Sequence, residues 1–228
     1  MKKGVISALI TCLSANLLFA NTNETRVDSI MKNVKDYTES VQQIRAIDEG
    51  SLLLYVKSTP SALSKAKIYN GLCWKYFSSE PLKAMRFAQL QYLLVDKLKN
   101  KDAIINAYDN LAWLHQGFSD HETSIKFMLK ALKAKELVYD QAGVSISLSG
   151  LASNYYKLNN YQLALNYFNQ TLTTEKKSGR KLQEAATLTN VGLCYVGLNK
   201  IDKGLEAYLK AVDLYVENNI EVEAATVY

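Results

Sequence analysis

The chain repeats itself at intervals of 40 residues from about residue 60 to its end, and this repeat constrains its fold more than any other feature. A small residue recurs at this spacing, at Ala84, Ser124, Ala164 and Gly204. A large side chain follows four positions later in three copies, at Met128, Phe168 and Tyr208, and the first copy has Ala88 there. Such a repeat predicts stacked supersecondary units, because one unit cannot bury its apolar face alone.

Each copy contains two amphipathic stretches joined by a polar turn. Positions 108, 111, 112 and 115 follow the i, i+3, i+4, i+7 spacing of one helical face. The turns are Gly117 to Asp120 in the second copy and Leu158 to Asn160 in the third. Small residues at the crossing let two helices approach closely while large ones fill the neighbouring groove. We therefore predict an all-α fold, a solenoid of helical hairpins.

The residue types follow one order along the copies. The fourth copy has Leu188, Val191, Gly192, Tyr195, Gly204, Tyr208 and Ala211, and the third has Leu148, Leu151, Ala152, Tyr155, Ala164 and Phe168. This order resembles the tetratricopeptide repeat (TPR) signature, W-x2-L-G-x2-Y followed by A-x3-F. The resemblance covers residues 60–228 and implies a right-handed α-solenoid.

The chain departs from the TPR pattern in three ways. No copy has the closing Pro, the Trp of the first signature position is replaced, and the period is 40 rather than 34. We expect the extra residues in linkers such as Lys176 to Lys181. Armadillo and HEAT repeats share the longer period, but the small-x3-large spacing favours TPR.

Residues 21–59 precede the array. Apolar residues form one helical stripe here and predict an N-terminal capping helix or a degenerate first hairpin: Ile30, Val34, Tyr37, Val41, Ile44 and Ile47. Residues 60–228 then hold about four hairpins. A fifth hairpin is expected to begin at the C-terminus, because Tyr228 stands forty residues after Leu188.

The first twenty residues have the form of a secretory signal peptide. Lys2 and Lys3 precede a short apolar stretch that ends at Ala20, a small residue suited to cleavage. The alternative is an uncleaved anchor, although the stretch is short for a membrane span. The segment SEPLKAMRFAQLQYLLVDKLKNKDAIINAYDNLAWL resembles the start of exported TPR arrays in Gram-negative sensor proteins. That resemblance implies a location in the periplasm or outer envelope.

The sequence contains no motif for chemistry. GxxxxGK, GxGxxG, HExxH and GxSxG are all absent, and 2 His and 3 Cys leave little for a metal site. We predict no catalytic residue, no cofactor and no metal. His115 takes a signature Tyr position, and Cys73 and Cys194 are expected to be small, buried and unpaired. The net charge of +5 is too mild to imply nucleic acid, and no apolar stretch after the leader is long enough for a membrane span.

The first helix of each hairpin has a face opposite its core side, which lines the concave groove in TPR proteins. Amide side chains there suit a peptide backbone and flat aromatics suit its apolar side chains. The candidate peptide-binding residues are Asn70, Trp74, Phe77, Asn110, Trp113, Tyr156 and Asn190. Asn110 and Asn190 match asparagines that bind peptide backbone in several TPR families. The alternative is that Trp74 and Trp113 pack between adjacent repeats and contact no ligand.

These features predict a non-catalytic scaffold that binds a protein or peptide in its concave groove, as the extracytoplasmic sensing part of a signalling protein. One alternative is a structural adaptor for an envelope complex. Another is the N-terminal part of a longer chain with a histidine-kinase or DNA-binding output domain. The last helix carries apolar residues such as Leu205 and Leu209 without a polar capping helix after it, so we also expect self-association through the C-terminal end.

Overall fold

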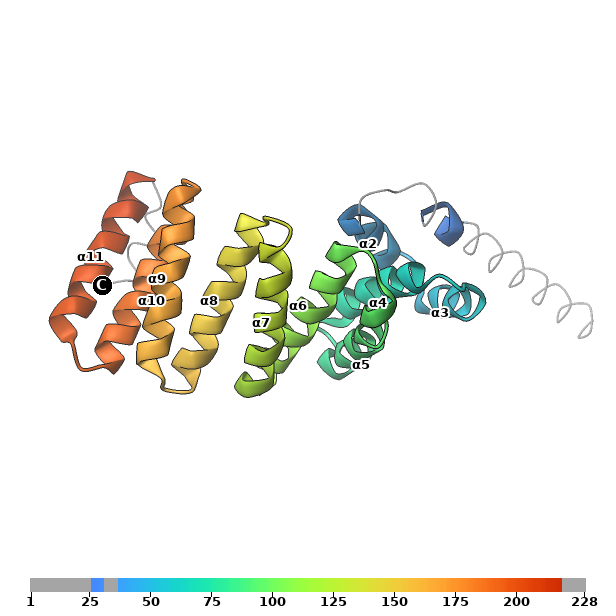
Figure 1. Ribbon diagram of the computed structural model, residues 1–228, viewed down its shortest axis with the longest axis horizontal. Helices are drawn as coiled ribbons and strands as arrows, with labels where there is room; N and C mark the ends of the chain where they lie inside the picture. Colours follow the sequence, from blue (N-terminus) through green and yellow to red (C-terminus); the bar gives the residue numbers. More distant parts are fainter. Residues whose placement is uncertain (1–25, 31–36, 219–228) are drawn as a thin grey trace, which may run out of the picture. The chain divides into compact units, whose positions relative to one another are not determined.

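The structure is a computed structural model that describes residues 26–30 and 37–218. The segment predicted to be a signal peptide, Val34 and the predicted start of a fifth hairpin lie outside these residues. The described part is helical and contains no strand. Residues 26–30 are helical. The helices that follow are α2 (Tyr37–Arg45), α3 (Glu49–Ser58), α4 (Ala62–Tyr76), α5 (Pro81–Tyr92), the short η1 (Val95–Lys97), α6 (Lys101–Gly117), α7 (His121–Glu136), α8 (Gln141–Lys157), α9 (Tyr161–Lys177), α10 (Lys181–Gly197) and α11 (Ile201–Glu217) (Figure 1).

The 40-residue period comes from long helices and short loops. α8, α9, α10 and α11 each have 17 residues. The loops between them, residues 158–160, 178–180 and 198–200, have three residues each. The expected linker at Lys176 to Lys181 is therefore wrong, because Lys176 and Lys177 end α9 and Lys181 begins α10. The residues beyond a 34-residue period lengthen the helices instead.

The loops share one backbone conformation. Each of five successive loops has one residue with positive φ, and these residues recur every 20 positions: Ser119 (61°), Tyr139 (57°), Asn159 (58°), Gly179 (66°) and Asn199 (58°). After α8, the N–H of Asn159 donates to the carbonyl of Tyr156 and the N–H of Asn160 donates to that of Tyr155, both at 2.9 Å. This pair of hydrogen bonds is a Schellman motif, which ends a helix by satisfying its last carbonyls. The same pair closes the other four loops.

The residue after each positive-φ position is the N-cap of the next helix. The side chains of Asp120, Asp140 and Asn160 each accept a hydrogen bond from a backbone N–H three residues later. Such caps stabilise a helix because its first amides have no partner within the helix. Arg180 and Lys200 hold the next two cap positions and provide no such bond.

The small residues of the repeat lie where the helices of a hairpin cross. Ala84, Ser124 and Ala164 have no exposed surface, and the Ser124 hydroxyl donates to the carbonyl of Ala112 at 2.8 Å. A Cβ on Gly204 would lie 3.2 Å from the carbonyl oxygen of Gly192. Met128 and Phe168 are 2% exposed. The predicted alternation of small and large residues is thus confirmed as helix–helix packing.

The contacts divide the chain into two compact units, which separate after Asn110 within α6. In the first unit α2 packs on α4, and Ile30, Val41, Ile44 and Ile47 of the predicted stripe are buried. The Glu49 carboxylate of α3 accepts hydrogen bonds from the α4 hydroxyl of Tyr76 at 2.6 Å and the α5 ammonium of Lys83 at 2.5 Å. This contact joins three consecutive helices.

The second unit is built from α7 to α11 and the end of α6, with each helix packed on the next (Figure 1). One core cluster of this unit includes Ala164 and Phe168 of α9 and Val191 and Cys194 of α10. Leu205 on α11 differs from its equivalents in earlier copies. It is 56% exposed, whereas Ile125 and Leu165 are 8% and 6% exposed because the following helices cover them. The outer side of α11 therefore presents apolar surface that earlier hairpins bury.

Candidate functional site

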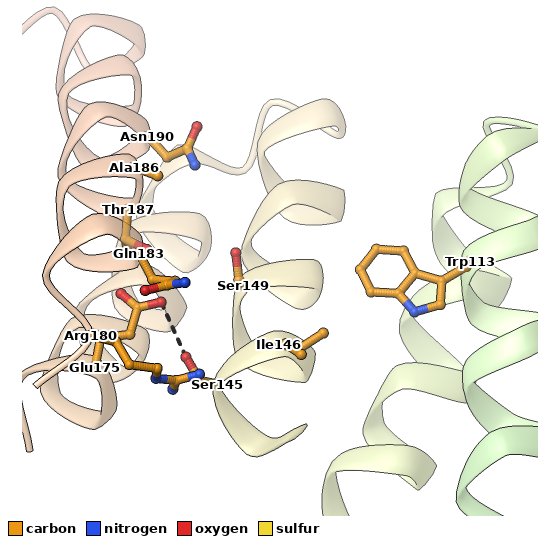
Figure 2. A pocket seen from close by; sticks show the side chains of 10 residues that line it. All are labelled: Trp113, Ser145, Ile146, Ser149, Glu175, Arg180, Gln183, Ala186, Thr187 and Asn190. Atoms are coloured by element: carbon orange, nitrogen blue, oxygen red, sulfur yellow. Dashed lines mark hydrogen bonds between the residues drawn. The ribbon is translucent and has the colours of Figure 1, made fainter. Parts of the chain in front are cut away.

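The second unit contains a pocket of about 240 Å³ on the first helices of its hairpins, α6, α8 and α10. The loop before α10 closes one side of it. Its lining combines an aromatic ring, small polar groups and a pair of opposite charges (Figure 2): Trp113, Ser145, Ile146, Ser149, Glu175, Arg180, Gln183, Ala186, Thr187 and Asn190.

Trp113 extends from α6 toward α8 and is partly buried (Figure 2). Its ring packs against the core cluster of Ala112, Ile125, Met128 and Leu151. A Cβ on Gly150 would lie 3.3 Å from Cη2 of Trp113 and 2.7 Å from Cε of Met128. Gly150 thus leaves room for the indole, which both packs between consecutive repeats and lines the pocket.

Glu175 and Arg180 bring charge to the pocket. Glu175, at the end of α9, is 4% exposed, and its Oε1 accepts a hydrogen bond from the hydroxyl of Ser145 at 3.2 Å (Figure 2). Burial raises the pKa of Glu175, although hydrogen bonds from Thr187 and Ser145 and the charge of Arg180 oppose the shift. The second oxygen of Glu175 has no hydrogen-bond partner, and neither do Nε and Nη2 of Arg180.

The pocket contains two of the predicted peptide-binding residues, Trp113 and Asn190. Tyr156 is in the same unit but does not line the pocket. Its ring packs against Tyr161, with centroids 5.4 Å apart and an interplanar angle of 60°. The other four predicted residues belong to the first unit.

Asn70 and Asn110 are equivalent residues of consecutive copies and are buried in the first unit, 2% and 0% exposed. The Nδ2 of Asn110 donates to Oδ1 of Asn70 at 2.6 Å and to Oε1 of Gln91 at 2.8 Å. This burial corrects the expectation that both amides face a ligand groove. The amides are used to join neighbouring repeats through hydrogen bonds.

Trp74 and Phe77 form an aromatic pair one turn apart on α4. Their rings stack with centroids 5.1 Å apart, and Trp74 is 37% exposed. The pair covers part of the surface of the first unit. A role for it in peptide binding stays a prediction.

His115, Cys73 and Cys194 lie outside the pocket. His115 lies with Nδ1 3.0 Å from Oδ2 of Asp120, and its ring stacks on Phe127. Cys73 and Cys194 are free and buried, which confirms their predicted state, and burial raises their thiol pKa values to about 12 and about 11. Within the described ranges, no three His, Cys, Asp or Glu side chains are grouped as metal ligands.

The sequence interpretation missed Glu175, Arg180, Ser145 and Gln183. Glu175 and Arg180 lie in or beside the segment that we had expected to be a linker, where charged residues carry no special signal. The one available signal was the cap position, which recurs every 20 residues as Asn or Asp and changes at position 180 to Arg.

Comparison with known proteins identifies the fold family. Residues 103–177 and 143–217 match the family described as Tetratricopeptide repeat, and together they cover half of the chain. The chain belongs to the tetratricopeptide repeat family. TPR arrays present extended concave surfaces on which other proteins bind, so the chain is a protein-interaction scaffold in this general sense. No curated protein matches its sequence.

Solved structures of TPR proteins share the fold at low identity. Aspartyl phosphate phosphatase F from Bacillus subtilis has 15% identity and a TM-score of 0.70 over 93% of this chain, which spans 55% of the phosphatase chain. A Rap protein complexed with Competence and Sporulation Factor has 14% identity and a TM-score of 0.60, with 82% and 53% covered. Nearly identical TPR-like repeats of a kinesin light chain from Podosopora anserina have 13% identity and a TM-score of 0.65, with 87% and 95% covered. None of the helices in the described residues is long and apolar enough to span a membrane.

Proposed function

We propose that this TPR protein binds an extended peptide in the pocket formed by α6, α8 and α10, as the sensing part of an exported signalling protein. The observation that carries the proposal is the pocket itself. The lining includes an indole, the amides of Gln183 and Asn190, and two charged groups that each have buried atoms without a hydrogen-bond partner. This mixture suits a peptide, which offers backbone hydrogen bonds beside apolar side chains.

One neighbour supports this reading by analogy. The Rap protein, which has the same fold, is complexed with Competence and Sporulation Factor. The low identity transfers only the fold, so ligand binding by this chain rests on its own pocket. A binding role rather than a catalytic one follows from the family, because tetratricopeptide repeats build extended surfaces for interaction.

Binding can be tested with a pool of random-sequence synthetic peptides and the full chain. We expect Trp113→Ala to reduce retention of the pool about tenfold, because the indole provides the largest apolar surface of the pocket. Since Trp113 is only partly buried, its stability loss should stay below the about 3–5 kcal/mol of a core Trp truncation. Urea unfolding measures that loss.

Phe118→Ala is the matched control, because Phe118 is an aromatic residue of the same unit that does not line the pocket and is 43% exposed. It should leave retention of the peptide pool unchanged. Equal retention by Trp113→Ala and the unaltered chain, with both folded, would contradict a ligand site at this pocket.

Export is a separate part of the proposal and rests on residues 1–20. Fusing this segment to a reporter enzyme that is active only outside the cytoplasm tests it in a Gram-negative host. We expect activity from the natural leader and a loss of activity when Lys2 and Lys3 are replaced by Glu, because the positive n-region is needed for export. An inactive fusion with the natural leader would remove the extracytoplasmic location and leave peptide binding unaffected.

A further inference from the structure

Three buried polar atoms without a hydrogen-bond partner meet at the same pocket. They are Oε2 of Glu175 and Nε and Nη2 of Arg180. Among the described residues the only other buried side-chain atom in this state is Oδ1 of Asn110, which belongs to the first unit. Buried polar groups are almost always paired, so one acceptor and two donors left open side by side indicate a missing partner.

Arg180 occupies its place at the expense of helix stability. Its position is the N-cap of α10, where Asp120, Asp140 and Asn160 cap their own helices. A cation at a helix N-terminus is also unfavourable to the helix dipole. Lys200 likewise stands in place of Asp or Asn at the N-cap of α11, but its side chain is exposed. Of these two cap residues, Arg180 is the one that lines the pocket and has buried donor atoms without a partner.

The two charged groups of the pocket do not neutralise each other by direct contact. Nε and Nη2 of Arg180 and Oε2 of Glu175 have no hydrogen-bond partner, so these atoms do not bond to one another. The hydroxyl of Ser145 on α8 donates to the other Glu175 oxygen at 3.2 Å. The nearby carboxylate of Glu184 is paired with Lys181 at 3.2 Å and Lys176 at 3.7 Å. The pocket therefore offers an open negative acceptor and an open positive donor to the same ligand.

This combination selects among the groups that a peptide can offer. A carboxylate would pair with Arg180 but would be repelled by Glu175, and an ammonium would meet the opposite conflict. A carboxamide is neutral and planar, and it carries an acceptor and a donor on neighbouring atoms. We propose that the pocket recognises the side-chain amide of Asn or Gln in the bound peptide, whose carbonyl accepts from Arg180 and whose N–H donates to Glu175.

The rest of the lining suits the residues that flank such an amide. Trp113 and Ile146 lie on the α6 and α8 side and offer apolar surface to a neighbouring side chain (Figure 2). Gln183 and Asn190 on α10 offer donors and acceptors to the peptide backbone. This inference rests on the proposed peptide-binding function and adds the residue type that the site selects.

The test uses synthetic peptide pools that are random except for one fixed central residue, which is Gln, Asn, Glu, Lys or Leu. We expect the full chain to retain the Gln or Asn pool about tenfold better than the Leu pool, because hydrogen bonds to charged groups are stronger than neutral ones. Glu175→Gln removes the negative charge and should move the preference to the Glu pool. Arg180→Gln should move it to the Lys pool.

Lys200→Gln is the matched control, because it changes the same kind of residue at the next cap position, where the side chain is exposed. It should keep the preference for Gln or Asn. Far-UV circular dichroism verifies that each variant is folded.

The outcomes separate this inference from the function on which it rests. A preference of the unaltered chain for the Glu pool, or variants that select as the unaltered chain does, would overturn amide recognition. Equal retention of all pools would also overturn amide recognition, and the proposed peptide binding would stand. This outcome is expected if water, or a direct Glu175–Arg180 ion pair, satisfies the open atoms. Failure to retain any pool would instead overturn the proposed function.

Discussion

Single residues at the start of each helix set part of the stability of this array. Asp120, Asp140 and Asn160 cap the helices that follow them, and Lys200 leaves α11 without a side-chain cap. We predict that Lys200→Asp raises the free energy of unfolding by about 1 kcal/mol, because it adds a cap and favours the helix dipole. Asp120→Ala should lower it by about the same amount. Urea denaturation measures both, and an unchanged midpoint for Lys200→Asp would contradict the prediction.

Glu175 should make stability depend on pH. Burial raises its pKa above the ordinary value of 4.5, so the native state favours the protonated carboxyl. Its stabilising contribution is complete below the unfolded pKa and is lost as the pH rises through the native pKa. We therefore expect Glu175→Gln to be more stable than the unaltered chain near neutral pH. The difference in stability between the two proteins should become smaller as the pH falls to about 4.5. Thermal melting across this pH range tests the prediction. A difference in melting temperature that grows toward acid pH would contradict it.

Sequence patterns revealed the residues that recur and missed those that break the recurrence. Ala164 and Ser124 could be placed at helix crossings because a small residue stands at the same position in every copy. Asn110 could not be recognised as buried, since an amide at a periodic position suits a hydrogen bond to a neighbouring repeat as well as one to a peptide. Arg180 was missed because its importance depends on an unfilled contact, which no spacing reveals.

At the scale of the elements, the hairpins α6–α7, α8–α9 and α10–α11 each pack a small residue of the first helix near a large residue of the second. The pairs are Ala112 with Met128, Ala152 with Phe168, and Gly192 with Tyr208. A Cβ on Gly192 would overlap the ring of Tyr208. Gly192→Ala should therefore destabilise the α10–α11 hairpin by about 1–3 kcal/mol through overpacking. Adding Tyr208→Met recreates the pair of the second copy and should recover most of the loss. A double variant no more stable than the single one would show that the pair is not coupled.

The register of the helices has its own test. Ala164 has no exposed surface where α9 crosses its partner, whereas Lys157 is exposed at the end of α8. Ala164→Phe should lower stability by roughly 1–3 kcal/mol because the ring cannot enter the crossing, and Lys157→Phe should have little effect. Thermal melting compares them, and equal melting temperatures would refute the register.

The boundaries of the elements were only partly predictable. The turns at Gly117 to Asp120 and Leu158 to Asn160 are confirmed, because the hydrophobic periodicity stops there. The link between hairpins was expected to be long because the 40-residue period exceeds the 34 residues of a typical TPR. Most positive-φ positions carry Ser, Tyr or Asn rather than Gly, so the loop ends had no clear marker in the sequence.

For the molecule as a whole, the exposed side of α11 predicts association. Leu205 is 56% exposed, while its equivalent Leu165 is 6% exposed under the following helices. Leu205→Gln should reduce self-association of the chain and leave its melting temperature nearly unchanged. Light scattering over a range of concentrations measures the first effect. Leu165→Gln is the contrasting control, and it should lower stability by several kcal/mol because it buries an amide. A concentration-independent monomer before any substitution would contradict the expectation.

The identical loops have a consequence for how such a gene can change. Because the five joints between α6 and α11 adopt the same backbone path at the same 20-residue interval, recombination that duplicates or deletes one 40-residue copy in frame within this span rebuilds the same joint. The resulting protein can therefore fold without a loop of new sequence or conformation. An array of this kind can therefore vary in copy number between lineages while the residues that line one pocket diverge on their own.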